Sequence, residues 1–187
     1  MTGPARPLAA LAVARTPVFL CGAKDLAFVL ALLPVSTAAL ADDDLMLNPF
    51  GDPFVQATVG RPCPAPLGPA YTEAARRGEA HSRIERGTSC WLAGRCAEPN
   101  AYRYDAPNAI AATAALRRDL TLADSAIWVT AQRRLIYLEG CVAGADQAAR
   151  AEAIVKALVD VDRVIPALAL PGEKPPYPTA GAASLPR

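Results

Sequence analysis

The sequence has few of the residues that enzymes use for catalysis. Its 187 residues include a single histidine, His81, and the neighbouring Ser82 lacks the G-x-S-x-G context of a nucleophile elbow. The sequence contains no recognisable set of acid, base and nucleophile that could form one active site, so we expect a protein that is not an enzyme. We interpret His81 as part of a helix face.

Ligand patterns for metals are also missing. Structural zinc sites prefer closely spaced cysteine pairs such as C-x2-C, whereas five residues separate Cys90 from Cys96. The acidic run Asp42-Asp43-Asp44 lacks the spaced oxygen ligands of calcium sites. The sequence therefore predicts neither a metal nor a cofactor.

The chain has no excess of one charge, because its formal net charge is +1. Residues 1–41 carry three of the 19 basic residues and one of the 18 acidic residues, so the remainder has a formal charge of −1. A general nucleic-acid-binding protein needs a clustered basic surface. We therefore expect no nucleic-acid partner.

The apolar run at residues 26–41 is too short for a membrane-spanning helix, which needs about 20 apolar residues. It has 16 residues and contains Pro34. Basic residues precede it, and it ends in Ala39-Leu40-Ala41 directly before acidic residues. This layout is typical of a secretory signal peptide. We expect residues 1–41 to be cleaved after Ala41, leaving a mature protein in the periplasm or peripheral to a membrane.

The cysteines that follow the expected cleavage site are even in number: Cys63, Cys90, Cys96 and Cys141. An even number in an exported chain indicates two disulfides, with three possible pairings. Cys141, Trp128 and Tyr137 are expected on the outer face of a sheet, and such a group is unlikely to be left bare. We therefore expect residues 49–100 to cover this face, and favour the pairs Cys96–Cys141 and Cys63–Cys90.

Hydrophobic periodicity predicts an α+β fold. The expected elements are a helix over 73–86, a helix over 107–120, strands over 126–130 and 134–143, a helix over 146–158 and a last strand over 163–170. Pro166 cannot donate to a β-ladder, so it predicts an edge position for the last strand. Thr72 is the expected cap of the first helix. Its expected packing stripe is Ala74, Ala75, Gly78, His81 and Ile84.

Two further segments outside the periodic region have other compositions. Residues 42–106 form a Pro/Gly-rich, cysteine-containing extension with one helix, in which "GTSCWLAGRC" at 87–96 is expected to be a folded loop. Residues 171–187 are rich in proline and are expected to be a disordered tail.

Residues 107–170 resemble the BON domain, a lipid-associated module of bacterial envelope proteins. The resemblance rests on the order of elements and on an L-x-G-x-V signature formed by Leu138, Gly140 and Val142. It implies a single αββαβ module, with a three-stranded sheet and two helices on one of its faces. It also implies association with phospholipid and maintenance of the envelope, without catalysis.

Two arginine pairs are candidates for binding lipid: Arg117 with Arg118, and Arg133 with Arg134. Each arginine near an anionic lipid surface is worth about 1 kcal/mol. The expected fold places the pairs at opposite ends of the module, and solubilising charge is the alternative reading. A second function also stays open, in which the extension forms a docking surface for another envelope protein.

Overall fold

The structure is a computed structural model and describes residues 45–181 of the chain. The signal peptide expected at residues 1–41 lies outside these residues. None of the helices in the described part is long and apolar enough to cross a membrane.

A four-stranded sheet is the centre of the fold. Its strands lie in the order β2 (Phe54–Gln56), β4 (Ala126–Gln132), β5 (Leu135–Cys141) and β6 (Arg163–Ala169). The β5–β6 pair is parallel and the other pairs are antiparallel. In addition, the short strands β1 (Met46–Leu47) and β3 (Ala70–Tyr71) pair with each other.

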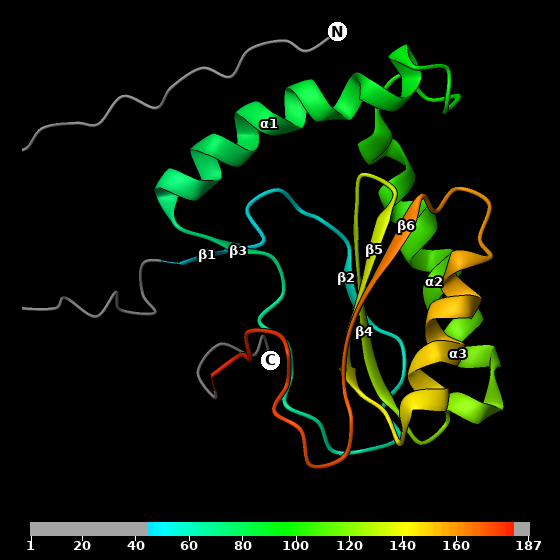
Figure 1. Ribbon diagram of the computed structural model, residues 1–187. Helices are drawn as coiled ribbons and strands as arrows, with labels where there is room; N and C mark the ends of the chain where they lie inside the picture. The colour runs from blue at the N-terminus through cyan, green and yellow to red at the C-terminus, as the bar shows by residue number, and fades with distance from the viewer. Residues whose placement is uncertain (1–44, 182–187) are drawn as a thin grey trace, which may run out of the picture. The chain divides into compact units, whose positions relative to one another are not determined.

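Two helices, α2 (Asp105–Arg118) and α3 (Ala145–Lys156), cover one face of this sheet (Figure 1). Alternate residues of β4 and β5 point toward the helices, so that Ile127, Val129, Ile136 and Leu138 are fully buried. Leu116 of α2 and Val155 of α3 complete the same core, among other residues. The predicted αββαβ order is therefore confirmed, and Pro166 lies in the edge strand β6 as expected.

The sheet has a fourth strand that the prediction lacked. Phe54–Gln56 comes from the N-terminal extension and pairs with β4, with Val55 opposite Val129. Without this strand the edge of β4 would present free backbone groups to solvent. The extension is thus part of the sheet as well as its cover.

The second face of the sheet is covered by chain from both ends of the described region. On this face, Trp128 lines one pocket together with Leu47, Phe54, Leu67 and Ala180. The predicted disordered tail is wrong for residues 171–181, because Tyr177 is buried and Thr179 bridges to Pro66. Backbone hydrogen bonds join the two segments, from Leu67 to the Pro178 carbonyl (2.8 Å) and from Ala180 to the Ala65 carbonyl (2.9 Å). Residues 182–187 lie outside the described part.

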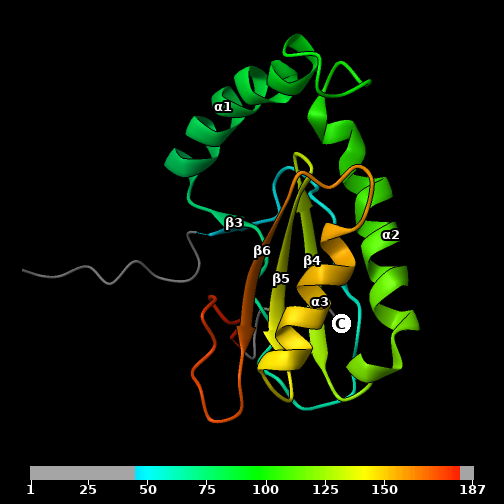
Figure 2. The ribbon, with the colours of Figure 1, turned by 45° about the vertical axis from the view of Figure 1, so that its right-hand side comes forward.

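Helix α1 (Glu73–Leu92) continues beyond the predicted 73–86 and includes Cys90, so the loop expected at 87–96 begins only after Leu92. Thr72 caps the helix by accepting a hydrogen bond from the Ala75 amide (3.3 Å). The helix ends beside η2 (Ala101–Tyr104), apart from α2 and α3 (Figure 2).

The expected packing stripe of α1 is wrong, since all five of its residues are exposed. The helix is held instead through Arg83, whose guanidinium donates to both oxygens of the buried Asp52 carboxylate. The same guanidinium lies over the rings of Phe50 (4.3 Å) and Tyr102 (4.4 Å). A buried ion pair between aromatic rings fixes this helix, and hydrophobic periodicity does not reveal such a contact.

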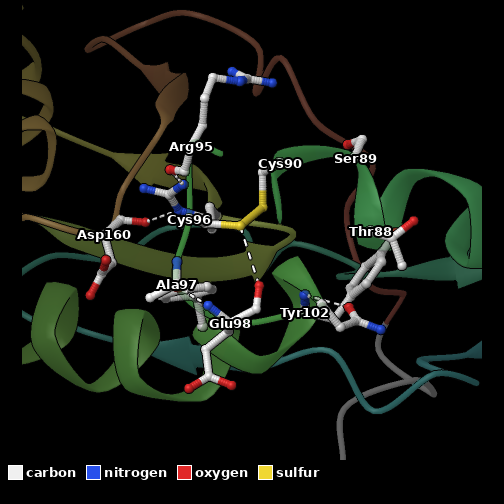
Figure 3. Close-up of a disulfide and its surroundings, with 12 residues drawn as sticks. Thr88, Ser89, Cys90, Arg95, Cys96, Ala97, Glu98, Tyr102 and Asp160 are labelled. Atoms are coloured by element: carbon white, nitrogen blue, oxygen red, sulfur yellow. Dashed lines mark hydrogen bonds between the residues drawn. A yellow bond between two sulfur atoms is a disulfide. The ribbon is translucent and has the colours of Figure 1, made fainter. Parts of the chain in front are cut away.

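The disulfides join Cys63 to Cys141 and Cys90 to Cys96, so the favoured pairing was wrong. Because α1 extends past Cys90 and the chain then turns back, Cys96 is brought to Cys90 rather than to the sheet. Figure 3 shows this local bridge, with the Cys96 Sγ 3.3 Å from the Glu98 carbonyl oxygen. Cys141 is on the covered face of β5, as expected, and its partner lies in the cover.

We predict that the two disulfides stabilise the fold unequally. The Cys63–Cys141 bridge spans 78 positions and the Cys90–Cys96 bridge spans six. In the chain-entropy model, losing them costs about 4 and about 2 kcal/mol respectively. Denaturant unfolding of the paired Ser variants of each bridge measures the two losses. Equal losses would contradict the assignment of Cys63–Cys141 as the main covalent tie.

Candidate functional site

An apolar groove runs between α2 and β2 on the helix-covered side of the sheet, with a volume of ≈ 400 Å³. Its lining residues are Pro53, Val55, Ala106, Ala109, Ile110, Thr113, Ala114 and Arg117. The α2 members recur at spacings of three and four residues, which places them on one side of the helix. This side faces β2, while Ala112 and Leu116 face the core.

Two large apolar side chains of the groove are open to solvent. Ile110 is 71% exposed and Val55 is 40% exposed. At the bottom of the same groove, Thr113 is 7% exposed, and its hydroxyl has no hydrogen-bond partner within residues 45–181. A buried hydroxyl without a partner costs free energy, so the groove offers both apolar contact and one unused hydrogen-bonding group.

Arg117 closes one end of the groove. Its Nε donates to the Ala57 carbonyl and its Nη2 to the Gln56 carbonyl, both at 2.9 Å. These bonds tie the end of β2 to the last turn of α2. The neighbouring Arg118 is exposed, and no described residue forms an ion pair or hydrogen bond with its side chain. Arg117 is therefore mainly structural, whereas Arg118 is free to meet a ligand.

The second arginine pair forms the turn between β4 and β5. Arg133 and Arg134 have φ angles of 56° and 63°, as a two-residue hairpin with a type I′ turn requires. Their backbone N–H groups donate to the two carboxylate oxygens of Asp105 at 2.8 and 3.0 Å. Burial raises the pKa of Asp105 even though these two hydrogen bonds act in the opposite direction.

The side chain of Arg134 already makes contacts within the protein. Its Nε donates to the Asp160 carbonyl (2.9 Å) and its Nη1 to the Arg95 carbonyl (3.2 Å), and its guanidinium lies 5.1 Å from the Tyr104 ring. Because Asp105 starts α2 and Arg117 and Arg118 end it, about 20 Å of helix separates the two arginine pairs. The four arginines do not form one patch.

A small cavity of ≈ 160 Å³ lies beside the hairpin turn and the Cys90–Cys96 bridge. Its lining includes Ser89, Arg95, Arg133 and Asp162. Figure 3 shows Arg95 and Ser89 beside this disulfide. The cavity brings backbone and charged groups together, but it has little apolar surface for a lipid.

The signature residues are structural in this fold. Leu138 and Val142 are buried in the core. Gly140 has a φ of 140°, and a Cβ at this position would lie 1.9 Å from the Ala126 carbonyl oxygen of β4. Only glycine allows β4 and β5 to approach so closely here.

His81 is exposed on α1, and its Nε2 lies 3.4 Å from Glu85. Within residues 45–181, no hydrogen bond or ion pair joins its side chain to a serine, a cysteine or a buried acid. The same residues contain no group of three or more His, Cys, Asp or Glu side chains that could hold a metal ion.

The family model of the BON domain matches residues 105–172. The match begins at the start of α2 and ends after β6, so it contains α2, β4, β5, α3 and β6. The strand β2 and the cover of the second face lie outside it, except for residues 171 and 172. No curated protein matches the sequence.

We predict that the adjacent arginines differ sharply in their effect on stability. Arg117→Ala removes two hydrogen bonds to β2 carbonyls and should lower the free energy of unfolding by about 1–2 kcal/mol. Arg118→Ala should change it by less than about 0.5 kcal/mol, because the side chain is exposed and unbonded. Denaturant unfolding compares them, and equal effects would show that the Arg117 contacts to β2 contribute nothing.

Proposed function

Since residues 105–172 form a BON domain, we propose that the protein associates with phospholipid through the groove between α2 and β2. BON domains are modules associated with phospholipid and with the bacterial envelope. The observation that carries the proposal is an exposed apolar groove that ends at Arg117, with the exposed Arg118 next to it in the sequence. An apolar surface bordered by cations matches the chemistry of an anionic lipid, which has acyl chains beneath a phosphate.

The geometry gives each part of the groove a role. Ile110 and Val55 contact the apolar part of the lipid, and Arg118 meets the phosphate. Burying one such apolar side chain is worth about 1.5–3 kcal/mol, and an arginine at an anionic surface about 1 kcal/mol. The sum supports weak, reversible and salt-sensitive binding rather than permanent anchoring.

We further propose that the protein is exported, is not an enzyme and contributes to the integrity of the envelope. Two disulfides support an oxidising compartment. BON domains are in general not enzymes, and His81 lacks the neighbours that catalysis would need. The expected cleavage after Ala41 belongs to the same proposal.

Vesicle co-sedimentation of residues 42–187 tests the lipid proposal. The protein should bind phosphatidylglycerol vesicles, and bind phosphatidylcholine vesicles more weakly. Ile110→Asp should weaken binding by about tenfold or more, because it places a charge where apolar contact is made. Arg118→Ala should weaken binding by about fivefold and reduce its dependence on salt.

Matched controls keep this test specific. Val159→Asp changes another strongly exposed apolar residue, and Arg163→Ala removes an exposed arginine on β6. Both should bind vesicles as the wild type does. If the wild type binds no vesicles, or if the control variants lose as much binding as the groove variants, the groove is not a lipid site. The docking of another envelope protein would then be the better explanation of the fold.

A further inference from the structure

A second cavity, of ≈ 300 Å³, lies on the face of the sheet opposite α2 and α3. One wall is the segment from Gly68 to Tyr71, and the other is formed by side chains of β4 and β5: Thr130, Gln132, Tyr137 and Glu139. In the register of the sheet, Thr130 pairs with Tyr137, and Glu139 pairs with Trp128. Alternation along the strands therefore directs all these residues to the same side.

The opposite wall of the cavity is held in place by hydrogen bonds. The Asn48 amide donates to the Pro69 carbonyl (2.6 Å), and Gln132 Nε2 donates to the Tyr71 hydroxyl (3.3 Å) and to Asp52 (3.0 Å). The ring of Phe50 packs edge-on against Tyr71 at 5.4 Å. These contacts hold the cavity open before any ligand arrives.

Glu139 has no hydrogen-bond or ion-pair partner in the described part of the chain, although it is partly buried. Three other shielded carboxylates are paired: Asp52 with Arg83, Glu79 with Arg86, and Asp105 with two backbone N–H groups. Burial raises the pKa of Glu139, and no cation opposes this effect. A partly buried carboxylate without a counter-ion is unfavourable, so a cation supplied from outside would relieve it.

Thr130 gives an independent indication of a ligand. It is 7% exposed, and its hydroxyl is without a hydrogen-bond partner among residues 45–181. The side chain lines the same cavity as Glu139. Two polar groups of one cavity, a carboxylate and a hydroxyl, thus lack the partners that buried polar groups normally have.

The other residues that line the cavity indicate which kind of cation it can bind. No lysine, arginine or histidine lines the cavity, which excludes an anionic ligand. Hard metal ions require many close oxygen ligands, whereas this cavity supplies one carboxylate in a space much larger than an ion. The aromatic rings of Tyr71 and Tyr137 are surfaces that attract organic cations through cation–π contacts.

We propose that this cavity binds an organic ammonium group, with Glu139 as its counter-ion, Thr130 as a hydrogen-bonding partner, and Tyr71 and Tyr137 as its aromatic walls. The ammonium group belongs either to a small soluble amine or to a lipid headgroup. The site lies across the sheet from the groove between α2 and β2. It therefore stands independently of the phospholipid groove.

Isothermal titration of residues 42–187 with ethanolamine and with choline tests the proposal. Both should bind, whereas 3,3-dimethylbutan-1-ol, a neutral analogue of choline, should not. Vesicles rich in phosphatidylethanolamine, tested with the Ile110→Asp variant, separate the two sources. Retained binding to these vesicles points to a lipid headgroup, and binding of the soluble amines alone points to a small amine.

Four variants locate the site. Glu139→Gln should weaken amine binding by about tenfold or more, while Glu152→Gln, on α3 at the other face, should leave it unchanged. Tyr137→Phe keeps the aromatic ring and should retain binding. Thr130→Val removes the unpaired hydroxyl, and should weaken binding while raising Tm. Loss of binding with an unchanged or higher Tm separates a ligand role from misfolding.

The proposal is overturned if neither amine binds the wild type, if the neutral analogue binds equally well, or if Glu139→Gln binds as the wild type does. None of these results bears on the α2–β2 groove, whose test uses phosphatidylglycerol vesicles and other residues. Conversely, failure of the groove variants leaves the amine result standing.

The stability of the unliganded protein gives a second prediction about Glu139. A carboxyl group whose pKa is raised on folding above 4.5 holds its proton more tightly in the folded state. The free energy of unfolding therefore falls as pH rises from 4.5 through the folded pKa. Glu139→Gln should raise Tm clearly at pH 7 and have little effect at pH 4.

None of the groups that face Glu139 changes its charge in the pH range in which Glu139 is expected to titrate. Tyr177, from the C-terminal segment, has its pKa raised to about 12, by burial first and by Glu139 second. Burial also raises the pKa of Tyr137 on β5, and an unperturbed tyrosine already titrates near pH 10. Cys63 and Cys141 are joined by a disulfide and do not titrate, and the facing residues of β4 and β6 carry no charge.

Thermal melts at several pH values test the prediction. An increase in Tm on Glu139→Gln that is larger at pH 4 than at pH 7 would refute it.

Discussion

The need to bury both faces of the central sheet governs this structure. Side chains of β4 and β5 alternate between the faces, and the helices α2 and α3 can cover only one of them. The other face carries Trp128, Tyr137 and Cys141. Its cover comes from residues 45–71 and 171–181, nearly all of which lie outside the segment that matches the BON domain. The Cys63–Cys141 bridge and the buried Tyr177, whose hydroxyl donates to the Pro64 carbonyl (2.9 Å), hold this cover in place.

Both candidate sites depend on the cover as well as on the BON domain. One wall of the apolar groove is β2, and Arg117 ties this strand to α2 through the Gln56 and Ala57 carbonyls. One wall of the cavity beside Glu139 is the segment 68–71. The added segments therefore change what the module offers to a ligand. A BON domain without them would have neither wall, although Ala57 is the one buried core residue that it would lose.

The periodic part of the sequence predicted the fold because each element there follows its own hydrophobic pattern. Strands β4 and β5 alternate, and Pro166 marks an edge strand. Strand β2 has only three residues after Pro53, which is too short for any period to be seen. The disulfide pairs depend on where α1 ends, and the docking of α1 depends on Arg83 between two aromatic rings. The order of the elements was enough to predict that the two arginine pairs lie far apart. Glu139 differs from the other carboxylates only in its folded surroundings, where it is partly buried and has no hydrogen-bond or ion-pair partner among the described residues.

The two sites lie on opposite faces of the sheet, and consecutive side chains of β4 point to opposite faces. Val129 points into the helix-facing core, opposite Val55 of the groove wall, while Thr130 points into the polar cavity. Since successive side chains of a strand lie on opposite sides of the backbone, a ligand on one face does not contact a ligand on the other. The extension contributes a wall to both sites, with β2 beside the groove and residues 68–71 beside the cavity. Strand β4 belongs to the BON domain, pairs with β2 of the groove wall and carries Thr130 of the cavity, so β2 and β4 together connect the two sites.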